Sequence, residues 1–318
     1  MTSDSPLRRR GLFKAGLALS TAVLAPAVTA APAKAAAGTP ASAKAAPAGA
    51  AVGSRHVADE LRVLERRYGA RLGVQARNAR TGQTLSYRAG ERFAMCSTFK
   101  VFAAAAVLRD HDRCAPLDKV VHYPPTDILP NSPITEQHVG SGMTVGELCA
   151  AAIQYSDNAA GNLLLRELGG PAGLTRFFRS LDDRVSRLDR WETDLNTAVP
   201  GDPRDTTTPG ALAASLERLT LGRALTGGDR EQLITWLKGN TTSAERFRKG
   251  LPEGWVVADK TGTGDYASAN DIGVAWTTRG TPVVLTVLTS KSAKDAAVDN
   301  ALVAEAAGVV ARTLAPGE

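Results

Sequence analysis

The sequence predicts an α+β fold in which both ends of the chain supply strands to one antiparallel sheet with flanking helices. Strand-like runs joined by turn residues lie at 71–87 and again from 255 to 289. Between these runs the apolar residues follow helical periodicity. Since the two groups of strands have to meet to form one sheet, residues 54–92 and 239–318 are assigned to an α/β lobe. Residues 93–238 are then an inserted all-helical lobe.

The first half of the chain begins with a capped helix and a hairpin. Ser54 is the expected cap of a helix whose apolar stripe ends at Tyr68, before Gly69. Strands are expected over 71–79 and 83–87, on either side of a turn that contains Gly82. An apolar run without Gly or Pro then predicts a helix. A polar loop follows to residue 142, and three further helices are expected after this loop. The helices expected here cover residues 97–109, 144–154, 159–168 and 172–181.

The second half contains a long irregular segment and a return to strands. Residues 187–205 are polar and unperiodic and end in Pro and Gly, which indicates a compact Ω loop. Arg190 and Asp205 flank this loop and are predicted to form an ion pair that closes it. Thr208 followed by Pro209 predicts the start of the next helix. Helices are expected over 208–221, 229–238 and 292–314, and strands over 255–258, 272–277 and 282–289.

Residues 1–30 have the features of an export signal. Arg8, Arg9 and Arg10 precede an apolar stretch and small-residue cleavage sites, and the paired arginines are typical of the twin-arginine route. A general secretory signal is the alternative. Residues 31–53 consist almost entirely of Ala, Pro, Gly, Ser, Thr and Lys, which predicts a disordered tether. We therefore expect an exported protein, secreted or in the cell envelope, without a stable membrane anchor.

The charge of the folded part excludes some partners. The whole chain has a formal net charge of +6, but residues 1–53 hold six basic residues and one acid. The remainder carries 32 basic and 31 acidic residues, so nothing favours nucleic acid as a partner. The three cysteines and four histidines show no metal-binding spacing, and we expect no metal and no cofactor.

The chemistry centres on Ser97 and Lys100. On a helix these residues lie one turn apart on the same face, so the amine can accept the hydroxyl proton and make the serine a nucleophile. A serine in the first helical turn also lies where free N–H groups stabilise a developing oxyanion. Taken alone this Ser-x-x-Lys pattern is weak, because it is common by chance.

Three further motifs follow in order, and together the four resemble a known family. They are Ser156-Asp157-Asn158, Glu192-x-x-x-Asn196 and Lys260-Thr261-Gly262. With the Arg-Leu-Asp-Arg-Trp-Glu run in the expected Ω loop, residues 55–315 resemble a class A serine β-lactamase. The resemblance implies the fold shared by that family and the penicillin-binding proteins, with residues 54–318 as the catalytic domain. It also implies hydrolysis of penicillins and cephalosporins by a monomer, and hence antibiotic resistance.

The resemblance implies a role for each catalytic side chain. Ser97 would form the acyl-enzyme, with its own N–H and that of Thr263 as the oxyanion hole. Ser156 would pass a proton to the ring nitrogen. Glu192 would activate the water that cleaves the ester, and either Lys100 or Glu192 would be the base for acylation.

The resemblance also implies a set of substrate-binding residues. Asn158 would bind the substrate side-chain amide and help to hold Lys100, while Asn196 would help Glu192 to position the water. Arg246 would help to bind the substrate carboxylate, although it stands in a basic run and could instead be a solvated surface residue. The residues expected along the carboxylate-binding strand are Lys260, Thr261, Gly262 and Thr263.

The sequence departs from the family pattern at a few positions. Thr193 follows the loop glutamate where the family often has proline, which leaves open whether that peptide bond is cis. Asn131 replaces an aromatic residue at the edge of the cleft. Cys96 lacks the cysteine partner of some carbapenem-hydrolysing members, because position 264 is glycine.

Two related functions share most of these motifs. A D-alanyl-D-alanine carboxypeptidase or other penicillin-binding protein has the serine, lysine and Lys-Thr-Gly groups but no Ω-loop glutamate. A sensor that is acylated once and then signals also lacks an effective deacylating base. Glu192 therefore favours the hydrolase over both.

Overall fold

A computed structural model of the chain describes residues 48–110 and 116–318. The predicted export signal, most of the predicted tether and Cys114 lie outside these residues. The first helix, α1 (Ala48–Tyr68), begins before the expected cap at Ser54, so residues 48–53 are helical rather than part of a tether. Within the described ranges, no helix is long and apolar enough to cross a membrane.

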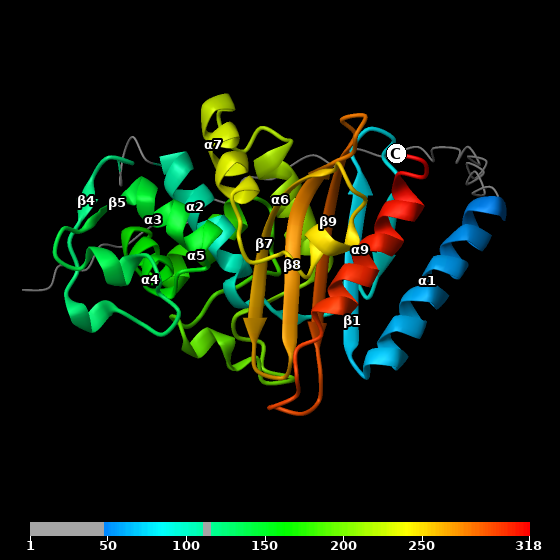
Figure 1. Cartoon of the computed structure of the whole chain (residues 1–318), viewed down its shortest axis with the longest axis horizontal. Coiled ribbons are helices and arrows are strands. Elements are labelled where there is room, and N and C mark those ends of the chain that lie inside the picture. Colours follow the sequence, from blue (N-terminus) through cyan, green and yellow to red (C-terminus); the bar gives the residue numbers. More distant parts are fainter. Residues whose placement is uncertain (1–47, 111–115) are drawn as a thin grey trace, which may run out of the picture. The chain divides into compact units, whose positions relative to one another are not determined.

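A five-stranded antiparallel sheet joins the two ends of the chain (Figure 1). Its strand order is β2-β1-β9-β8-β7, and β1 pairs with β9 along its whole length, from Arg71 opposite Ser290 to Asn78 opposite Val283. The strands are β1 (Arg71–Asn78), β2 (Thr84–Tyr87), β7 (Val256–Gly264), β8 (Ser268–Trp276) and β9 (Pro282–Ser290). The predicted union of early and late strands in one sheet is confirmed.

Strands β7 and β8 are longer than predicted. The sequence analysis ended one strand at residue 258 and began the next at 272, whereas the ladder continues from Lys260 opposite Ile272 to Gly264 opposite Ser268. Most of the added residues are polar, and Lys260, Asn270 and Asp271 are fully buried. A prediction that looks for apolar runs misses such a segment, because these buried polar side chains are paired with residues elsewhere in the chain, as Lys260 is with Ser156 and Asn270 is with Met95.

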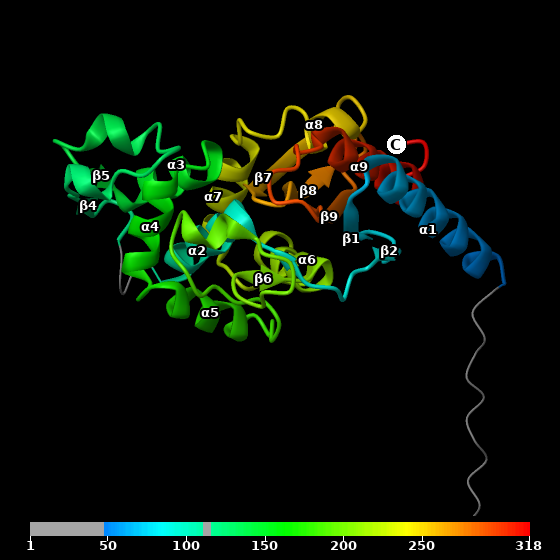
Figure 2. The same cartoon turned by 90° about the horizontal axis from the view of Figure 1, so that it is seen from below.

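Helices cover both faces of the sheet. Figure 2 shows α1, α8 (Phe247–Gly250) and α9 (Asn300–Leu314) on one side and α6 (Pro209–Thr220) on the other. Helix α9 begins at Asn300 and not at residue 292 as predicted, because residues 291–299 form a polar loop tied by a Lys291–Asp299 ion pair of 2.5 Å. Helix α6 packs on β1, β8 and β9, although the sequence analysis assigned it to the helical lobe.

The remaining helices surround α2 (Phe99–Asp110). Every residue from Phe99 to Leu108 is buried, because α3, α4, α5 and α7 all contact this helix. Lys100 at its start is therefore in the interior. The surrounding helices are α3 (Val145–Gln154), α4 (Asn158–Glu167), α5 (Pro171–Ser180) and α7 (Gly227–Lys238).

Short elements connect the helices to the sheet. β3 (Phe93–Ala94) pairs with β6 (Thr206–Thr207), so the segment before Ser97 lies against the end of the Ω loop. A second short pair joins β4 (Val120–Val121) to β5 (Met143–Thr144). The 3₁₀ turns are η1 (Cys96–Thr98), η2 (Pro125–Asp127), η3 (Thr135–His138) and η4 (Asp194–Thr197).

Candidate active site

The nucleophile candidate lies where η1 passes into α2. Lys100 Nζ donates a hydrogen bond of 2.9 Å to Ser97 Oγ, so the two side chains share one face as their spacing implies. β7 packs on η1, and glycine at position 262 makes this possible. A Cβ on Gly262 would lie 3.0 Å from the carbonyl oxygen of Met95.

Lys100 is fully buried and is held from several directions. Its Nζ lies 2.9 Å from Glu192 Oε1, and it also donates to the carbonyl oxygen of Ser156 at 2.8 Å and to Asn158 Oδ1 at 2.6 Å. Helix α4 approaches closely because it has glycine at position 161, where a Cβ would lie 2.8 Å from Lys100 Cε. The amine therefore has little freedom to leave Ser97.

Glu192 reaches the same hydroxyl from the Ω loop. Its Oε1 accepts a hydrogen bond of 3.3 Å from Ser97 Oγ, and its Oε2 accepts one of 2.5 Å from Asn196 Nδ2. The residue is only 5 % exposed, and its side chain is fully buried. The Glu192–Thr193 peptide bond, which the sequence left open, is cis.

The side chain of Asn162 holds the backbone of Glu192 in place. The sequence analysis did not identify Asn162 as a site residue. Its Nδ2 donates to the Glu192 carbonyl oxygen at 3.0 Å, and its Oδ1 accepts from the Glu192 N–H at 2.9 Å. The available signal was its spacing from Asn158, since residues four apart on a helix share a face.

The Ω loop is closed by the predicted ion pair. Arg190 Nε donates to Asp205 Oδ2 at 2.6 Å, and Asp205 is fully buried. Asp205 Oδ1 also accepts the backbone N–H groups of Asp189 and Arg190 at 2.7 and 2.9 Å. One buried carboxylate thus fastens the entry of the loop to its exit.

Ser156 and Lys260 face each other across the cleft from opposite parts of the fold. Lys260 Nζ donates to Ser156 Oγ at 3.0 Å and to the carbonyl oxygen of Thr261 at 2.7 Å. Burial, reinforced by the charge of Lys100, holds the pKa of Lys260 well below that of an ordinary lysine. Ser156 therefore stands beside a cation that can also release a proton.

Arg246 is a buried residue, so the solvated-surface interpretation is wrong. It is 6 % exposed and donates to the carbonyl oxygens of Gly262 and Asn270 at 2.9 and 2.7 Å. It also donates to Thr263 Oγ1 at 2.7 Å and to Asn300 Oδ1 at 2.8 Å. No carboxylate in the described part of the chain forms an ion pair with it, and burial lowers its pKa. The charge of Asp271 acts against this shift, but no described carboxylate lies within ion-pair distance of the guanidinium.

Thr242 supports the same strand and was also missed by the sequence analysis. Its Oγ1 lies 2.5 Å from Thr261 Oγ1 and 2.8 Å from Asn240 Oδ1. The Thr261 hydroxyl is therefore held by Thr242, and the Thr263 hydroxyl is held by Arg246. The edge of β7 thus presents an ordered row of polar groups.

The positions that depart from the family pattern also lie around the cleft. Asn131 has a left-handed backbone with φ of 58°, and its carbonyl oxygen accepts the Asn158 N–H at 3.0 Å. Cys96 and Cys149 are buried free thiols, and burial together with the charge of Glu192 raises the pKa of Cys96 to about 12. A Cβ on Gly264 would lie 2.8 Å from Cys96 Sγ. Among the residues that the structure describes, no group of His, Cys, Asp or Glu could hold a metal ion.

Known proteins are similar to this chain in sequence and in structure. The model of the β-lactamase enzyme family matches residues 56–314. β-Lactamase AST-1 of Nocardia asteroides is 54% identical, over 79% of this chain and 81% of that protein. The carbapenem-hydrolysing β-lactamase KPC of Klebsiella oxytoca is 52% identical, over 79% of this chain and 86% of that protein.

A solved structure agrees with these relatives. It is a class A β-lactamase described as the last common ancestor of Gram-negative bacteria, and it matches with a TM-score of 0.77 and 52% identity. The match covers 80% of this chain and 97% of that one. The family match, these relatives and the shared fold show that the chain belongs to the class A serine β-lactamases.

Proposed function

We propose that the protein hydrolyses the β-lactam ring of penicillins and cephalosporins through an acyl-enzyme on Ser97, and so confers antibiotic resistance. The observation that carries this proposal is the position of Ser97 Oγ, 2.9 Å from Lys100 Nζ and 3.3 Å from Glu192 Oε1. A hydroxyl between an amine and a carboxylate can lose its proton as it attacks. The names of the relatives support the same activity.

Acylation opens the ring. Ser97 Oγ attacks the lactam carbonyl, and either Lys100 or Glu192 accepts the hydroxyl proton, since both contact it. The N–H groups of Ser97 and Thr263 stabilise the oxyanion. Ser156 Oγ, which Lys260 contacts at 3.0 Å, passes a proton to the ring nitrogen as the carbon–nitrogen bond breaks.

Substrate binding depends on the cations beside β7. Lys260 and Arg246 attract the substrate carboxylate, and Thr261 and Thr263 add hydroxyl donors. Gly262 lets the strand approach the nucleophile, and Asn158 binds the substrate amide. Arg246 suits this role because it is buried beside Thr263 without an ion-pair partner among the described residues.

Deacylation makes the protein a hydrolase and not a penicillin-binding protein. Glu192, positioned by Asn196 and Asn162, deprotonates a water that attacks the ester on Ser97. The alternatives share the nucleophile but have no such base.

A chromogenic cephalosporin tests the activity directly. The purified protein is expected to turn over the substrate many times, and Ser97→Ala is expected to be inactive and unlabelled. If instead the parent protein traps one equivalent of drug and releases no product in later turnovers, it is a penicillin-binding protein or a sensor.

We also propose that the protein reaches its site of action through the twin-arginine route and acts as a monomer without a nucleic-acid partner. Arg9 and Arg10 support the route, and the near balance of 32 basic and 31 acidic residues after residue 53 argues against nucleic acid. Replacing Arg9 and Arg10 by lysine keeps the charge and is expected to abolish export. Undiminished export of that double variant would assign the protein to the general secretory route.

A further inference from the structure

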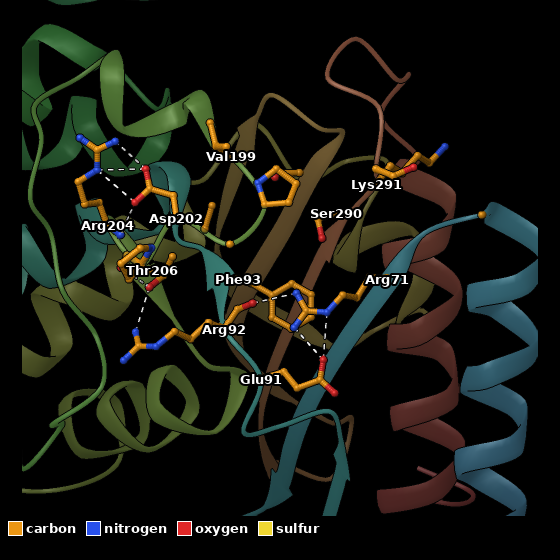
Figure 3. Close-up of a pocket in the computed structure, with 18 residues that line it drawn as sticks. Arg71, Glu91, Arg92, Phe93, Val199, Asp202, Arg204, Thr206, Ser290 and Lys291 are labelled. Atoms are coloured by element: carbon orange, nitrogen blue, oxygen red, sulfur yellow. Dashed lines mark hydrogen bonds and ion pairs between the residues drawn. The ribbon is translucent and has the colours of Figure 1, made fainter.

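A cavity of about 660 Å³ lies beside the end of the Ω loop and contains none of the catalytic side chains (Figure 3). We call it the Ω-exit cavity. Its volume is in the range of small-molecule sites. Its walls are residues 91–94, 198–204 with Thr206, and 290–292, together with Gly69, Arg71 and Ser268.

The cavity has a substantial apolar wall. Val199, Pro200 and Pro203 of the Ω loop line it together with Phe93 and Ala94 of β3. Phe93 is only 3 % exposed, and the Arg71 guanidinium lies over its ring at 3.9 Å from the centroid, so the accessible apolar surface comes mainly from the loop residues and Ala94. Val199 is 45 % exposed and so adds accessible apolar surface to this lining. A flat apolar molecule could cover these side chains.

The polar part of the lining is dominated by cations. Four cationic side chains and two carboxylates line the cavity. Three of the cations are paired: Arg71 with Glu91 at 2.7 Å, Arg204 with Asp202 at 2.7 Å, and Lys291 with Asp299 at 2.5 Å.

Arg92 is the exception. Its side chain runs from beside Arg71 to Thr206 (Figure 3), and Nη1 donates to Thr206 Oγ1 at 2.9 Å and to the Val185 carbonyl oxygen at 3.2 Å. No carboxylate of the described chain pairs with it, and its Nε and Nη2 have no protein acceptor there. One edge of a guanidinium is thus available, and its geometry matches a carboxylate.

We propose that the Ω-exit cavity is a second ligand site, which takes a small flat apolar molecule with one carboxylate bound to Arg92. The apolar walls receive the body of this ligand, and the free edge of the guanidinium receives its anion. The site is separate from the β-lactam cleft, because the two share no side chain.

Two walls of the site continue into the catalytic machinery. β3 ends at Ala94, just before Ser97, and the Met95 N–H donates to the Asp205 carbonyl oxygen at 2.8 Å. Residues 198–204 follow η4, which contains Asn196, the partner of Glu192. A ligand that favours one position of these segments therefore changes turnover without entering the cleft.

The probe for this site is 1-naphthoate, with the uncharged 1-naphthylmethanol as its matched control. Calorimetry should show one naphthoate bound per protein and at least tenfold weaker binding of the alcohol. Arg92→Gln should lower naphthoate affinity about tenfold, because one charge-assisted contact is lost, and Arg92→Lys should restore part of it. Arg66→Gln is the matched control, since Arg66 is also exposed, lies outside the cavity and has no ion pair in the described chain.

Amide NMR shifts locate the probe. Changes in amide chemical shift on adding naphthoate are expected within residues 198–204 and 290–292. In a kinetic assay, naphthoate should inhibit turnover of a cephalosporin non-competitively. Equal affinity of parent and Arg92→Gln, equal affinity for acid and alcohol, or purely competitive inhibition would each overturn the proposal. The comparison of acid with alcohol needs no variant, so it holds even if Arg92→Gln folds poorly. The calorimetric and NMR measurements use no β-lactam, so failure of the hydrolase proposal leaves them intact.

Discussion

Lys100 Nζ lies 2.9 Å from Glu192 Oε1, and both side chains are completely buried. One residue comes from the start of α2 and the other from the Ω loop, so the contact joins two independent parts of the chain. Ser97 Oγ lies within hydrogen-bond distance of both groups. Lys100 and Glu192 can therefore act in different half-reactions, acylation and deacylation, at the same Ser97 oxygen.

Replacing Glu192 by alanine should separate acylation from deacylation. The ring should still open, but loss of the general base should slow hydrolysis of the ester by about 10²–10⁴-fold. Intact-protein mass spectrometry after mixing with a penicillin should show the mass of the protein plus one drug molecule. Ser97→Ala is the control and should show no adduct. Unchanged steady-state turnover by Glu192→Ala would remove this residue from the mechanism.

Replacing Asp205 by asparagine should loosen the Ω loop. Asparagine keeps an oxygen for the N–H groups of Asp189 and Arg190 but leaves the Arg190 guanidinium without its carboxylate partner. Breaking a buried pair in this way costs about 3–5 kcal/mol. Denaturant unfolding should show this loss, and turnover should fall with it.

An exposed ion pair provides the control for that loss. In the Arg218–Asp182 pair the side chains are 49% and 74% exposed. Asp182→Asn should therefore cost at most about 1 kcal/mol. Similar effects of the two substitutions would mean that Asp205 has no special part in closing the loop.

Replacing Arg246 by alanine should mainly weaken substrate capture. A charge-assisted hydrogen bond contributes about 1.5–3 kcal/mol, so kcat/KM on penicillins should fall by about 10–150-fold. A penicillin methyl ester has no carboxylate and serves as the control substrate, on which parent and variant should differ little. An equal loss on acid and ester would show that Arg246 acts only through its contacts with Gly262 and Asn270.

Asp271 should make stability fall as pH rises. Burial, and then the charge of Asp259, raise the pKa of Asp271 well above the ordinary 3.8. Between 3.8 and the raised value the folded state holds a proton that the unfolded state has lost, so the free energy of unfolding declines with rising pH.

Asp271→Asn tests this pH dependence. Asp271 Oδ2 accepts the Phe247 N–H at 3.2 Å, and Oδ1 has no donor among the described residues. An asparagine amide therefore fits and can donate to Asp259. The variant should lose part of the decline and be at least as stable as the parent at neutral pH. The measurement is denaturant unfolding across acidic to neutral pH. A steeper decline in the variant would contradict the assigned direction.

The sequence by itself determined the features that depend on spacing and local pattern. Helix geometry places Ser97 and Lys100 on one face wherever the helix lies, and turn residues mark the Ω loop and its flanking charges. The order of strand-like and helical segments was enough to predict a sheet made from both chain ends. Such features need only backbone geometry and the alternation of apolar with polar residues.

Tertiary structure alone decided which polar residues are buried and what they contact. Arg246 looked like part of a surface run, yet β7, β8 and α9 enclose it. Asn162 had no motif of its own, and its hold on Glu192 depends on how α4 meets the Ω loop. The apolar pattern alone left the polar stretch of β7 and β8 out of the predicted strands, because the partners of its side chains lie in other segments, and only the family resemblance placed residues 260–263 on a strand. The energy of a buried polar group depends on neighbours that are distant in sequence, and no local pattern records them.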